Sequence, residues 1–185
     1  PGEGEDQPLN SVLYFSDEMR YGLMSNVRRS WSKRRSRAVM PQQQMFANRY
    51  LYSAVAPISG ANFHLMGLSG MDGATELLFL QELKKQHPNE HVIVVIDNAP
   101  CHRGKALREI PGLSVIHLPS YSPELDPAER FFGEVRKATV CRTFDDLAAQ
   151  EKLIVARVKK LGDDAEGMKQ LTGYSWIVEQ CGVVS

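Results

Sequence analysis

Residues 91–97 read His-Val-Ile-Val-Val-Ile-Asp, an uninterrupted run of β-branched residues that ends at an acid. Such runs are typical of strands buried on both faces of a sheet, because the side chains on both sides then meet apolar neighbours. A second run, Ser-Val-Leu-Tyr-Phe-Ser at residues 11–16, ends in the same way at Asp17. The two runs predict two strands of one sheet, each followed directly by an aspartate.

The rest of the chain predicts three further strands, at residues 50–56, 62–68 and 114–118. The first two of these form a hairpin across the turn that contains Pro57 and Gly60. A helix is expected from Asp72 to about His87, since Pro88 cannot continue it. Its apolar stripe is expected to consist of Leu77, Leu78, Leu80 and Leu83.

Further helices are expected near residues 105–108, from Pro127 towards Cys141, and over residues 144–160 and 164–171. Strands and helices in this order predict an α/β fold with a mixed five-stranded sheet flanked by helices. The 185 residues suit one domain over residues 11–185, behind a flexible acidic lead-in at residues 1–10.

Composition excludes several classes of protein. No apolar run approaches the roughly 18–20 residues that a membrane helix needs, so we expect no membrane-spanning segment. The three cysteines are widely separated and include no C-x-x-C pair, which argues against a disulfide framework and against a structural zinc site. The chain begins without Met, so we expect it to be part of something longer.

The formal net charge is zero, but the charges are unevenly distributed. Six cations and no acid fall within residues 28–37: Arg28, Arg29, Lys33, Arg34, Arg35 and Arg37. This segment is a predicted phosphate-contacting surface, with a solvated charged loop as the alternative. Trp31 within it either stacks on a base or anchors the loop to the domain.

The two strand-ending aspartates suggest a site. If their strands are parallel neighbours, Asp17 and Asp97 meet at one edge of the sheet, where α/β folds build sites. Paired carboxylates repel one another and favour a divalent cation between them. The alternative is that each aspartate is simply a turn residue.

Glu129 also allows two interpretations. Asp126, Pro127 and Glu129 fit the start of a helix, with Asp126 as the N-cap and Glu129 reaching back to it in a capping box. Glu129 equally fits a metal site at the mouth of the fold, because its helix face continues to Gly133 and then to Arg136 and Lys137. Spacing alone leaves both open.

Two segments resemble the signature of the mariner-type transposases and their bacterial insertion-sequence relatives. They are Asp97-Asn98-Ala99-Pro100-Cys101-His102 and residues 118–129, Leu-Pro-Ser-Tyr-Ser-Pro-Glu-Leu-Asp-Pro-Ala-Glu. The segment Phe15-Ser16-Asp17-Glu18 is similar to the strand that carries the first aspartate in that family. The resemblance covers residues 11–137. It departs from the family at Asp126, where Asn is more common, at Ser120, where Pro is common, and in a slightly short spacing between Asp97 and Glu129.

The resemblance implies a ribonuclease-H-like fold and a catalytic triad of Asp17, Asp97 and Glu129. The same three acids would hold two Mg²⁺ ions, with Mn²⁺ as a substitute. It implies hydrolysis at transposon ends, followed by attack of a freed 3′-hydroxyl on target DNA. Glu18, Glu124 and Asp126 are competing acids that match the family positions less well.

The resemblance also implies that the partners are double-stranded DNA, at transposon ends and target, and a second copy of the chain. We expect DNA contacts from the six cations of residues 28–37 and from His102, Lys105, Arg136 and Lys137. His102 could equally be a satisfied turn histidine. The expected location is the bacterial cytoplasm, at the nucleoid. The family's helix-turn-helix region is not expected within residues 1–10.

Two alternatives remain close to this interpretation. One is a ribonuclease-H-like nuclease or resolvase that performs no strand transfer. The other is a non-catalytic DNA-binding protein derived from a transposase, although three intact acids argue against it. A phosphatase or kinase-like enzyme is disfavoured, since the sequence has no glycine-rich phosphate loop.

Overall fold

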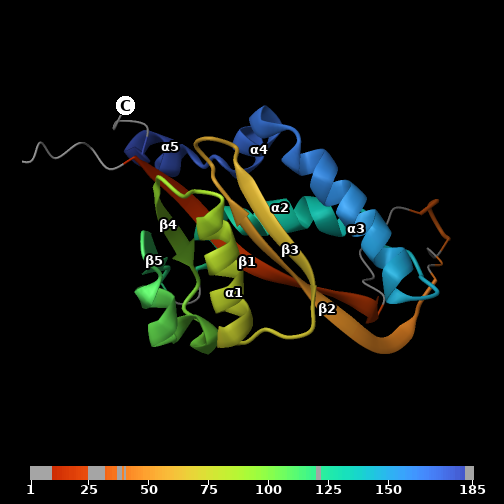
Figure 1. Cartoon of the computed structure of the whole chain (residues 1–185). Helices are drawn as coiled ribbons and strands as arrows, with labels where there is room; N and C mark the ends of the chain where they lie inside the picture. The colour runs from red at the N-terminus through yellow and green to blue at the C-terminus, as the bar shows by residue number, and fades with distance from the viewer. Residues whose placement is uncertain (1–9, 25–31, 37–38, 40, 120–121, 182–185) are drawn as a thin grey trace, which may run out of the picture.

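The computed structural model of the chain describes residues 10–24, 32–36, 39, 41–119 and 122–181. The described part contains a sheet and two layers of helices (Figure 1). The strands are β1 (Ser11–Met24), β2 (Gln44–Val55), β3 (Asn62–Leu68), β4 (His91–Ile96) and β5 (Leu113–His117). The helices are α1 (Gly73–Lys85), α2 (Pro127–Arg136), α3 (Leu147–Gly162), α4 (Ala165–Thr172) and α5 (Ser175–Cys181). Three short 3₁₀ turns are η1 (Pro100–Arg103), η2 (Lys105–Glu109) and η3 (Pro123–Leu125).

The sheet is mixed, as predicted, with strand order β3-β2-β1-β4-β5. The central strand β1 pairs antiparallel with β2 and parallel with β4, and β4 pairs parallel with β5. The predicted β2–β3 hairpin is confirmed. Helix α1 covers one face of the sheet, and α2 to α5 lie on the other (Figure 1).

Alternation along β1 divides the core into two clusters, because successive side chains of a strand point to opposite faces. Tyr14 packs in the cluster that includes Phe79 and Leu80 of α1. Its neighbour Phe15 packs in the cluster that includes Phe131 and Phe132 of α2. Odd-numbered residues of β1 therefore face α2, and even-numbered residues face α1.

Strand β1 is longer than predicted. The prediction ended the strand at Asp17, but β1 continues to Met24 and pairs with β2 as far as Gln44. Met19, Tyr21 and Leu23 are buried on alternate positions, so the apolar pattern of a strand simply resumes after the acids. Asp17 therefore lies within a strand rather than at its end.

Helix α1 lies within the predicted range, from Gly73 to Lys85, and its N-cap Asp72 accepts hydrogen bonds from the backbone N–H groups of Ala74 and Thr75. Its buried stripe differs from the prediction, since Leu78 is 45% exposed. The stripe instead consists of Glu76, Phe79, Leu80 and Leu83. Positions 76, 79, 80 and 83 follow helical spacing, whereas position 78 lies outside that face.

The C-terminal third agrees with the prediction in outline. Helix α2 begins at Pro127 as predicted but ends at Arg136, short of Cys141, which has left-handed backbone (φ 57°). Helices α3 and α4 correspond to the predicted helices at residues 144–160 and 164–171, whereas α5 was not predicted.

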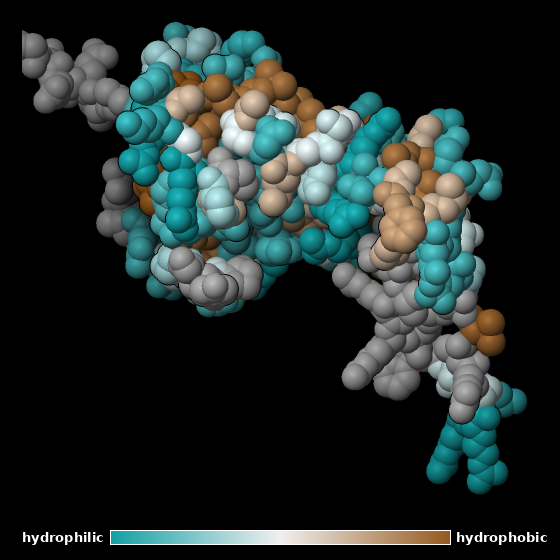
Figure 2. Space-filling model, turned by 90° about the horizontal axis from the view of Figure 1, so that it is seen from below, coloured by the Kyte–Doolittle hydropathy of each residue, from teal (hydrophilic) through white to brown (hydrophobic). Residues whose placement is uncertain are grey.

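The far end of the β1–β2 pair extends away from the main body. Figure 2 shows it as a smaller lobe with hydrophobic side chains at its surface. Exposed side chains of this end include Met24, Met45 and Phe46. In the described ranges, no helix is both long and apolar enough to cross a membrane. The expected lead-in at residues 1–9 lies outside the described residues.

Candidate functional site

Asp17 and Asp97 lie at the same level of two neighbouring strands. Strands β1 and β4 pair in parallel with Phe15 opposite Val95, and each aspartate comes two residues later. The predicted meeting of the two acids at one edge of the sheet thus follows from the register.

A cleft of about 460 Å³ opens at this edge of the sheet. Its lining includes four acids: Asp17, Asp97, Asp126 and Glu129. Asp17 lies in β1, Asp97 directly follows β4, and the other two lie at the start of α2. The cleft wall also contains residues 98–100, Arg103, Leu118, Pro119 and Ser122. The two segments that carry the family resemblance therefore line one cavity.

Asp17 is the most enclosed of the predicted triad. As an odd-numbered residue of β1 it faces α2, where Asp126 and Glu129 lie. Burial, followed by the negative charges of Asp126 and Glu18, raises the pKa of Asp17 to about 8. A backbone hydrogen bond from Glu18 acts in the opposite direction. An ionised Asp17 therefore needs a positive charge nearby.

Asp97 follows β4 directly, and its side chain is 54% exposed at the cleft. Its Oδ1 accepts hydrogen bonds from the backbone N–H of Ala99 at 2.9 Å and from Nδ1 of His102 at 2.6 Å. The first of these is the turn contact that the alternative interpretation of Asp97 predicts. The turn role and a role in the cleft therefore coexist.

Helix α2 brings two acids to the cleft. Asp126 is the predicted N-cap and accepts a hydrogen bond from the backbone N–H of Ala128. Burial raises the pKa of Asp126 to about 7, against the effect of that hydrogen bond and with the help of the charge of Glu129. The Glu129 side chain, 42% exposed, extends to Nη1 of Arg136 at 3.3 Å. Asp126 thus caps the helix, and Glu129 remains available to the cleft.

The ligand atoms of Asp17, Asp97 and Glu129 do not converge to a single point. Within the described ranges, the group of acid and imidazole atoms that all lie within 4.8 Å of one another consists of Glu18, Glu76 and His102. A pair of ions separated by about 3.5–4 Å does not require all three acids to touch the same ion.

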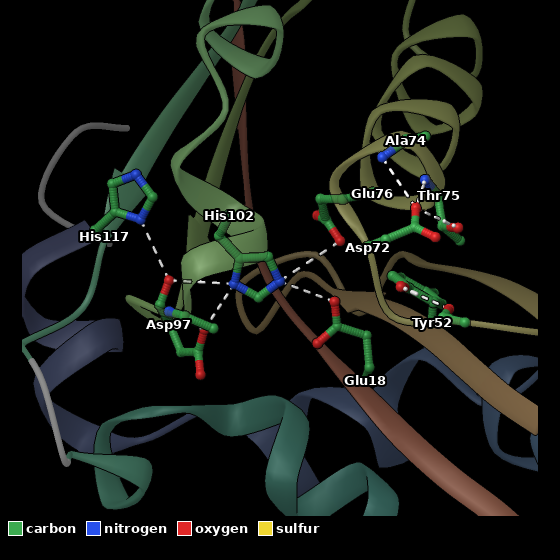
Figure 3. A network of polar contacts seen from close by, with 11 residues as sticks. Glu18, Tyr52, Asp72, Ala74, Thr75, Glu76, Asp97, His102 and His117 are labelled. Atoms are coloured by element: carbon green, nitrogen blue, oxygen red, sulfur yellow. Dashed lines mark hydrogen bonds and ion pairs between the residues drawn. The ribbon is translucent and has the colours of Figure 1, made fainter.

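A buried polar network lies behind Asp97 (Figure 3). His102 is 2% exposed and lies between Asp97 on one side and two glutamates on the other. Its Nε2 is 2.9 Å from Oε1 of Glu18 and 3.7 Å from Oε2 of Glu76. The side chains of Glu18 and Glu76 are only 4% and 2% exposed.

Charges in this network shift one another's ionisation. Burial acts to lower the pKa of His102, but the hydrogen bond and charge of Glu18, with the charges of Glu76 and Asp97, raise it to about 10. Burial and then the charge of Glu18 raise the pKa of Glu76 to about 8. The network therefore favours a protonated imidazole between acids.

The residues predicted to bind DNA fall into three groups. Lys33, Arg34 and Arg35 are exposed, as is Lys105 on η2. Arg136 contacts Glu129, and Lys137 is exposed and pairs with Glu134. Arg28, Arg29, Arg37 and the neighbouring Trp31 lie outside the described residues.

His102 requires a correction, because it was predicted to border the DNA. Its burial and its contacts with carboxylates at both ring nitrogens leave no free face for a phosphate or base. The alternative of a satisfied histidine describes its surroundings better.

Two polar residues of the site region, Glu76 and Arg103, were not predicted from the sequence. The sequence does contain an indication for Glu76, because it lies on the same helix face as Phe79, Leu80 and Leu83, where a charged residue is unexpected. Arg103 lines the cleft, and its guanidinium donates to the side-chain and backbone oxygens of Asn98 at 3.0 and 2.9 Å. No spacing rule singled out Arg103, whereas Asn98 belongs to the segment that carries the family resemblance.

Two solved structures with a similar fold are complexes of the Mos1 transposase. The mariner Mos1 paired end complex with Mg matches 92% of this chain at 19% identity, with a TM-score of 0.61. The Mos1 strand transfer complex matches 88% of this chain at 19% identity, with a TM-score of 0.58. The match covers 55% of the Mos1 chain in each case, so this chain spans about half of that protein's length.

These structural matches show that the fold is the one predicted, a mixed sheet flanked by helices of the ribonuclease-H-like kind. Among curated proteins, none matches the sequence. Residues 12–150 match the family described as DDE superfamily endonuclease, and this match covers β1 to β5, all four acids of the cleft and the His102 network. The chain belongs to the DDE superfamily of endonucleases.

Proposed function

We propose that the chain is the catalytic part of a DNA transposase, in which Asp17, Asp97 and Glu129 hold divalent metal ions. The observation that carries the proposal is the cleft where these acids meet, at the edge of a sheet shared with the Mos1 complexes. Those complexes include paired-end complexes with Mg, with Mn and with the left transposon end, and a strand transfer complex, which supports the same chemistry here.

The donor set of the cleft fits a hard divalent cation such as Mg²⁺. All four acids offer carboxylate oxygens, the ligands that Mg²⁺ and Mn²⁺ prefer. The raised pKa values of Asp17 and Asp126 show that negative charge accumulates there at a cost in the absence of a cation. The resemblance implies two ions, and Asp17, Asp97 and Glu129 would hold them between them.

Metal ions held there would activate a water or a 3′-hydroxyl and stabilise the charge that develops on the scissile phosphate. The protein's own part is to hold three carboxylates at fixed positions on β1, β4 and α2. Arg103, held by Asn98 at the cleft wall, lies where a cation can contact a DNA phosphate. Arg136 neutralises part of the charge of Glu129 until substrate arrives.

Double-stranded DNA is the proposed partner. The exposed cations Lys33, Arg34 and Arg35, together with Arg28, Arg29 and Arg37, would contact its phosphates in a salt-dependent manner. Lys105, Arg136 and Lys137 would contribute further contacts near the cleft. We also propose that the active form is a homodimer, which processes two transposon ends in the bacterial cytoplasm, at the nucleoid.

A crystal of the protein soaked in Mn²⁺ and measured for anomalous signal tests the metal site. The proposal requires one or two peaks bounded by Asp17, Asp97 and Glu129, and their loss in Asp97→Asn. Glu124→Gln is the matched control, because Glu124 is an exposed acid in the segment between β5 and α2. Peaks that survive in Asp97→Asn, or that lie elsewhere, would overturn the assignment.

Nicking of supercoiled plasmid DNA in Mg²⁺ or Mn²⁺ tests the chemistry in the same variants. We expect Asp17→Asn, Asp97→Asn and Glu129→Gln to lose at least 100-fold in rate, as is usual when a group that stabilises developing charge is removed. Joining of a pre-cut oligonucleotide to the plasmid separates a transposase from a nuclease. Nicking without joining would favour the nuclease alternative.

A further inference from the structure

Two neighbouring acids of β1 serve opposite faces of the sheet. Asp17 faces α2 and the cleft, whereas Glu18 lies opposite Tyr52, whose ring packs on Phe79 of α1. Glu18 therefore points to the α1 side, where it meets Glu76 and His102. The sheet separates the cleft from this buried network, and Asp97 at the end of β4 is the acid that touches both.

His102 connects the two sides by its two ring nitrogens (Figure 3). Nδ1 is 2.6 Å from Oδ1 of Asp97, and Nε2 is 2.9 Å from Oε1 of Glu18. Ionised carboxylates only accept hydrogen bonds, so the ring donates at each end. The ring is thereby fixed in both position and rotation between the two carboxylates.

The contacts of Asp97 distinguish its two oxygens. Oδ1 accepts from Nδ1 of His102 and from the backbone N–H of Ala99, and the side chain is nevertheless 54% exposed. With Oδ1 engaged on the protein side, the other oxygen, Oδ2, is the one left for the cleft. Metal-binding carboxylates are commonly oriented in this way by hydrogen bonds from groups behind them.

We propose that His102 is a positioning residue, which is anchored on Glu18 and fixes the Asp97 carboxylate so that one oxygen is presented to a metal ion. This inference rests on the proposed function, because it takes Asp97 as a metal ligand. Glu76 completes the enclosure: its Oε2 is 3.7 Å from Nε2 of His102, and its buried Oε1 has no hydrogen-bond partner among the residues that the structure describes. His102 acts through Asp97 and touches no substrate.

Two other roles for the network make different predictions. If the network only stabilises the fold, a substitution of His102 that keeps the contact with Asp97 and one that keeps the contact with Glu18 should affect metal binding equally. A metal ion held by Glu18, Glu76 and His102 themselves would bind independently of Asp97. The first is tested by comparing substitutions that keep one contact each, and the second by measuring metal content in Asp97→Asn.

Substituting His102 by Asn or by Gln tests the two ring contacts one at a time. The side-chain nitrogen of Asn can replace Nδ1, so His102→Asn keeps the donor to Asp97 and loses the contact with Glu18. The nitrogen of Gln can replace Nε2, so His102→Gln keeps the contact with Glu18 and loses the donor to Asp97. His102→Asn removes the contact with Glu18, and His102→Gln removes the contact with Oδ1 of Asp97 together with the longer one, 3.3 Å, to its backbone oxygen. Both variants therefore lose buried polar contacts, and a lower melting temperature is expected in each.

Mn²⁺ affinity, measured by electron paramagnetic resonance of the free ion, is the readout. We expect His102→Gln to bind Mn²⁺ about tenfold or more weakly than the wild type, and His102→Asn to stay within about threefold. His64→Gln and His64→Asn are matched controls. His64 is also enclosed and contacted at both ring nitrogens, by Ser53 and Asn62, but it does not touch Asp97. Both controls should bind Mn²⁺ like the wild type.

Several outcomes would overturn the proposal. Equal Mn²⁺ affinity in folded His102→Gln, His102→Asn and wild type would show that Asp97 needs no positioning. Equal weakening in both variants would show a general structural effect. A stoichiometric metal ion retained by Asp97→Asn but lost in His102→Gln would make His102 a ligand instead.

Asp97→Asn also separates this inference from the proposed function. If Asp97→Asn binds Mn²⁺ as the wild type does, the proposed metal site itself fails. If Asp97→Asn loses Mn²⁺ while His102→Gln retains it, the proposed function stands and the positioning role falls.

Discussion

Ser53 lies directly opposite Asp17 in the antiparallel pair of β1 and β2, and Ser53 is fully buried. Its hydroxyl contacts Nδ1 of His64 at 3.0 Å, and Nε2 of His64 contacts Oδ1 of Asn62 at 3.0 Å. The most enclosed acid of the predicted triad is therefore flanked by a line of polar side chains on β2 and β3. All of these neighbours are neutral when His64 is neutral, so none of them offsets the charge of Asp17.

Asp17→Asn should stabilise the metal-free protein and abolish its stabilisation by metal. At neutral pH, folding requires Asp17 either to hold a proton or to bury a charge, and Asn removes that cost, on the order of 1–3 kcal/mol. Saturating Mn²⁺ should raise the free energy of unfolding of the wild type, by about 2.7 kcal/mol at 100 times the dissociation constant. Chemical denaturation with and without Mn²⁺ measures both effects. An equal gain from Mn²⁺ in the variant would remove Asp17 from the metal site.

Stability should fall as the pH drops from about 6.5 to about 4, and His64 should be one cause. Burial lowers the pKa of His64 to about 4, so the folded protein keeps this ring neutral while the unfolded chain takes up a proton below about 6.5. The contribution that is present above 6.5 and lost by pH 4 is on the order of 2–3 kcal/mol.

Urea unfolding across this pH range compares the wild type with His64→Gln, which can keep the contact with Asn62. The variant should show a shallower decline between pH 6.5 and 4. Parallel declines in the two proteins would assign the acid sensitivity to other groups.

Replacing either of two glycines by alanine should change the free energy of unfolding, in opposite directions. A Cβ at Gly22 would lie 2.5 Å from the backbone oxygen of Ala47, so Gly22→Ala should destabilise by about 1–3 kcal/mol. A Cβ at Gly133, within α2, would meet no atom of the described residues outside its own helix backbone within 4 Å, so Gly133→Ala should stabilise by about 0.5–1 kcal/mol. Thermal unfolding of the two variants gives the sign of each effect. Destabilisation by Gly133→Ala would mean that this helix face is closed by a contact that the structure does not contain.

Replacing Lys33, Arg34 and Arg35 by Ala should weaken DNA binding and reduce its dependence on salt. The slope of log affinity against log salt should fall by about 0.9 for each phosphate contact that is lost. Fluorescence anisotropy with a duplex at several salt concentrations measures it. Lys159→Ala with Lys160→Ala, at the exposed end of α3, is the control pair. If the variant lacking Lys33, Arg34 and Arg35 shows the same salt slope as the wild type, this segment is a solvated loop.

Local patterns in the sequence were sufficient to predict the strands, and they predicted that Asp17 meets Asp97 if the two strands are parallel neighbours. Those features depend on β-branched runs and on the parallel pairing of two strands, which such runs favour. The capping role of Asp126 also followed from local sequence, because an N-cap involves only the next few residues.

The buried network could not be predicted in the same way. Contacts between Glu18, Glu76 and His102 join three segments that are far apart in the chain, and no spacing rule relates them. The predicted end of β1 was wrong for a related reason. Two successive acids, Asp17 and Glu18, indicate the end of a strand, and only the pairing with β2 shows that β1 continues past them. Tertiary pairing, rather than local preference, decided both points.

The alternation of Asp17 and Glu18 also limits how this domain can change in evolution. Inserting or deleting one residue in β1 ahead of Asp17 would exchange the faces of the two acids, since a shift of one position reverses every side chain of a strand. The pairing of β1 with β2 is described as far as Met24 opposite Gln44, and residues 25–43 connect the two strands. Differences in length among descendants of such a gene should therefore accumulate in that connection, while the spacing from Ser11 to Glu18 stays constant.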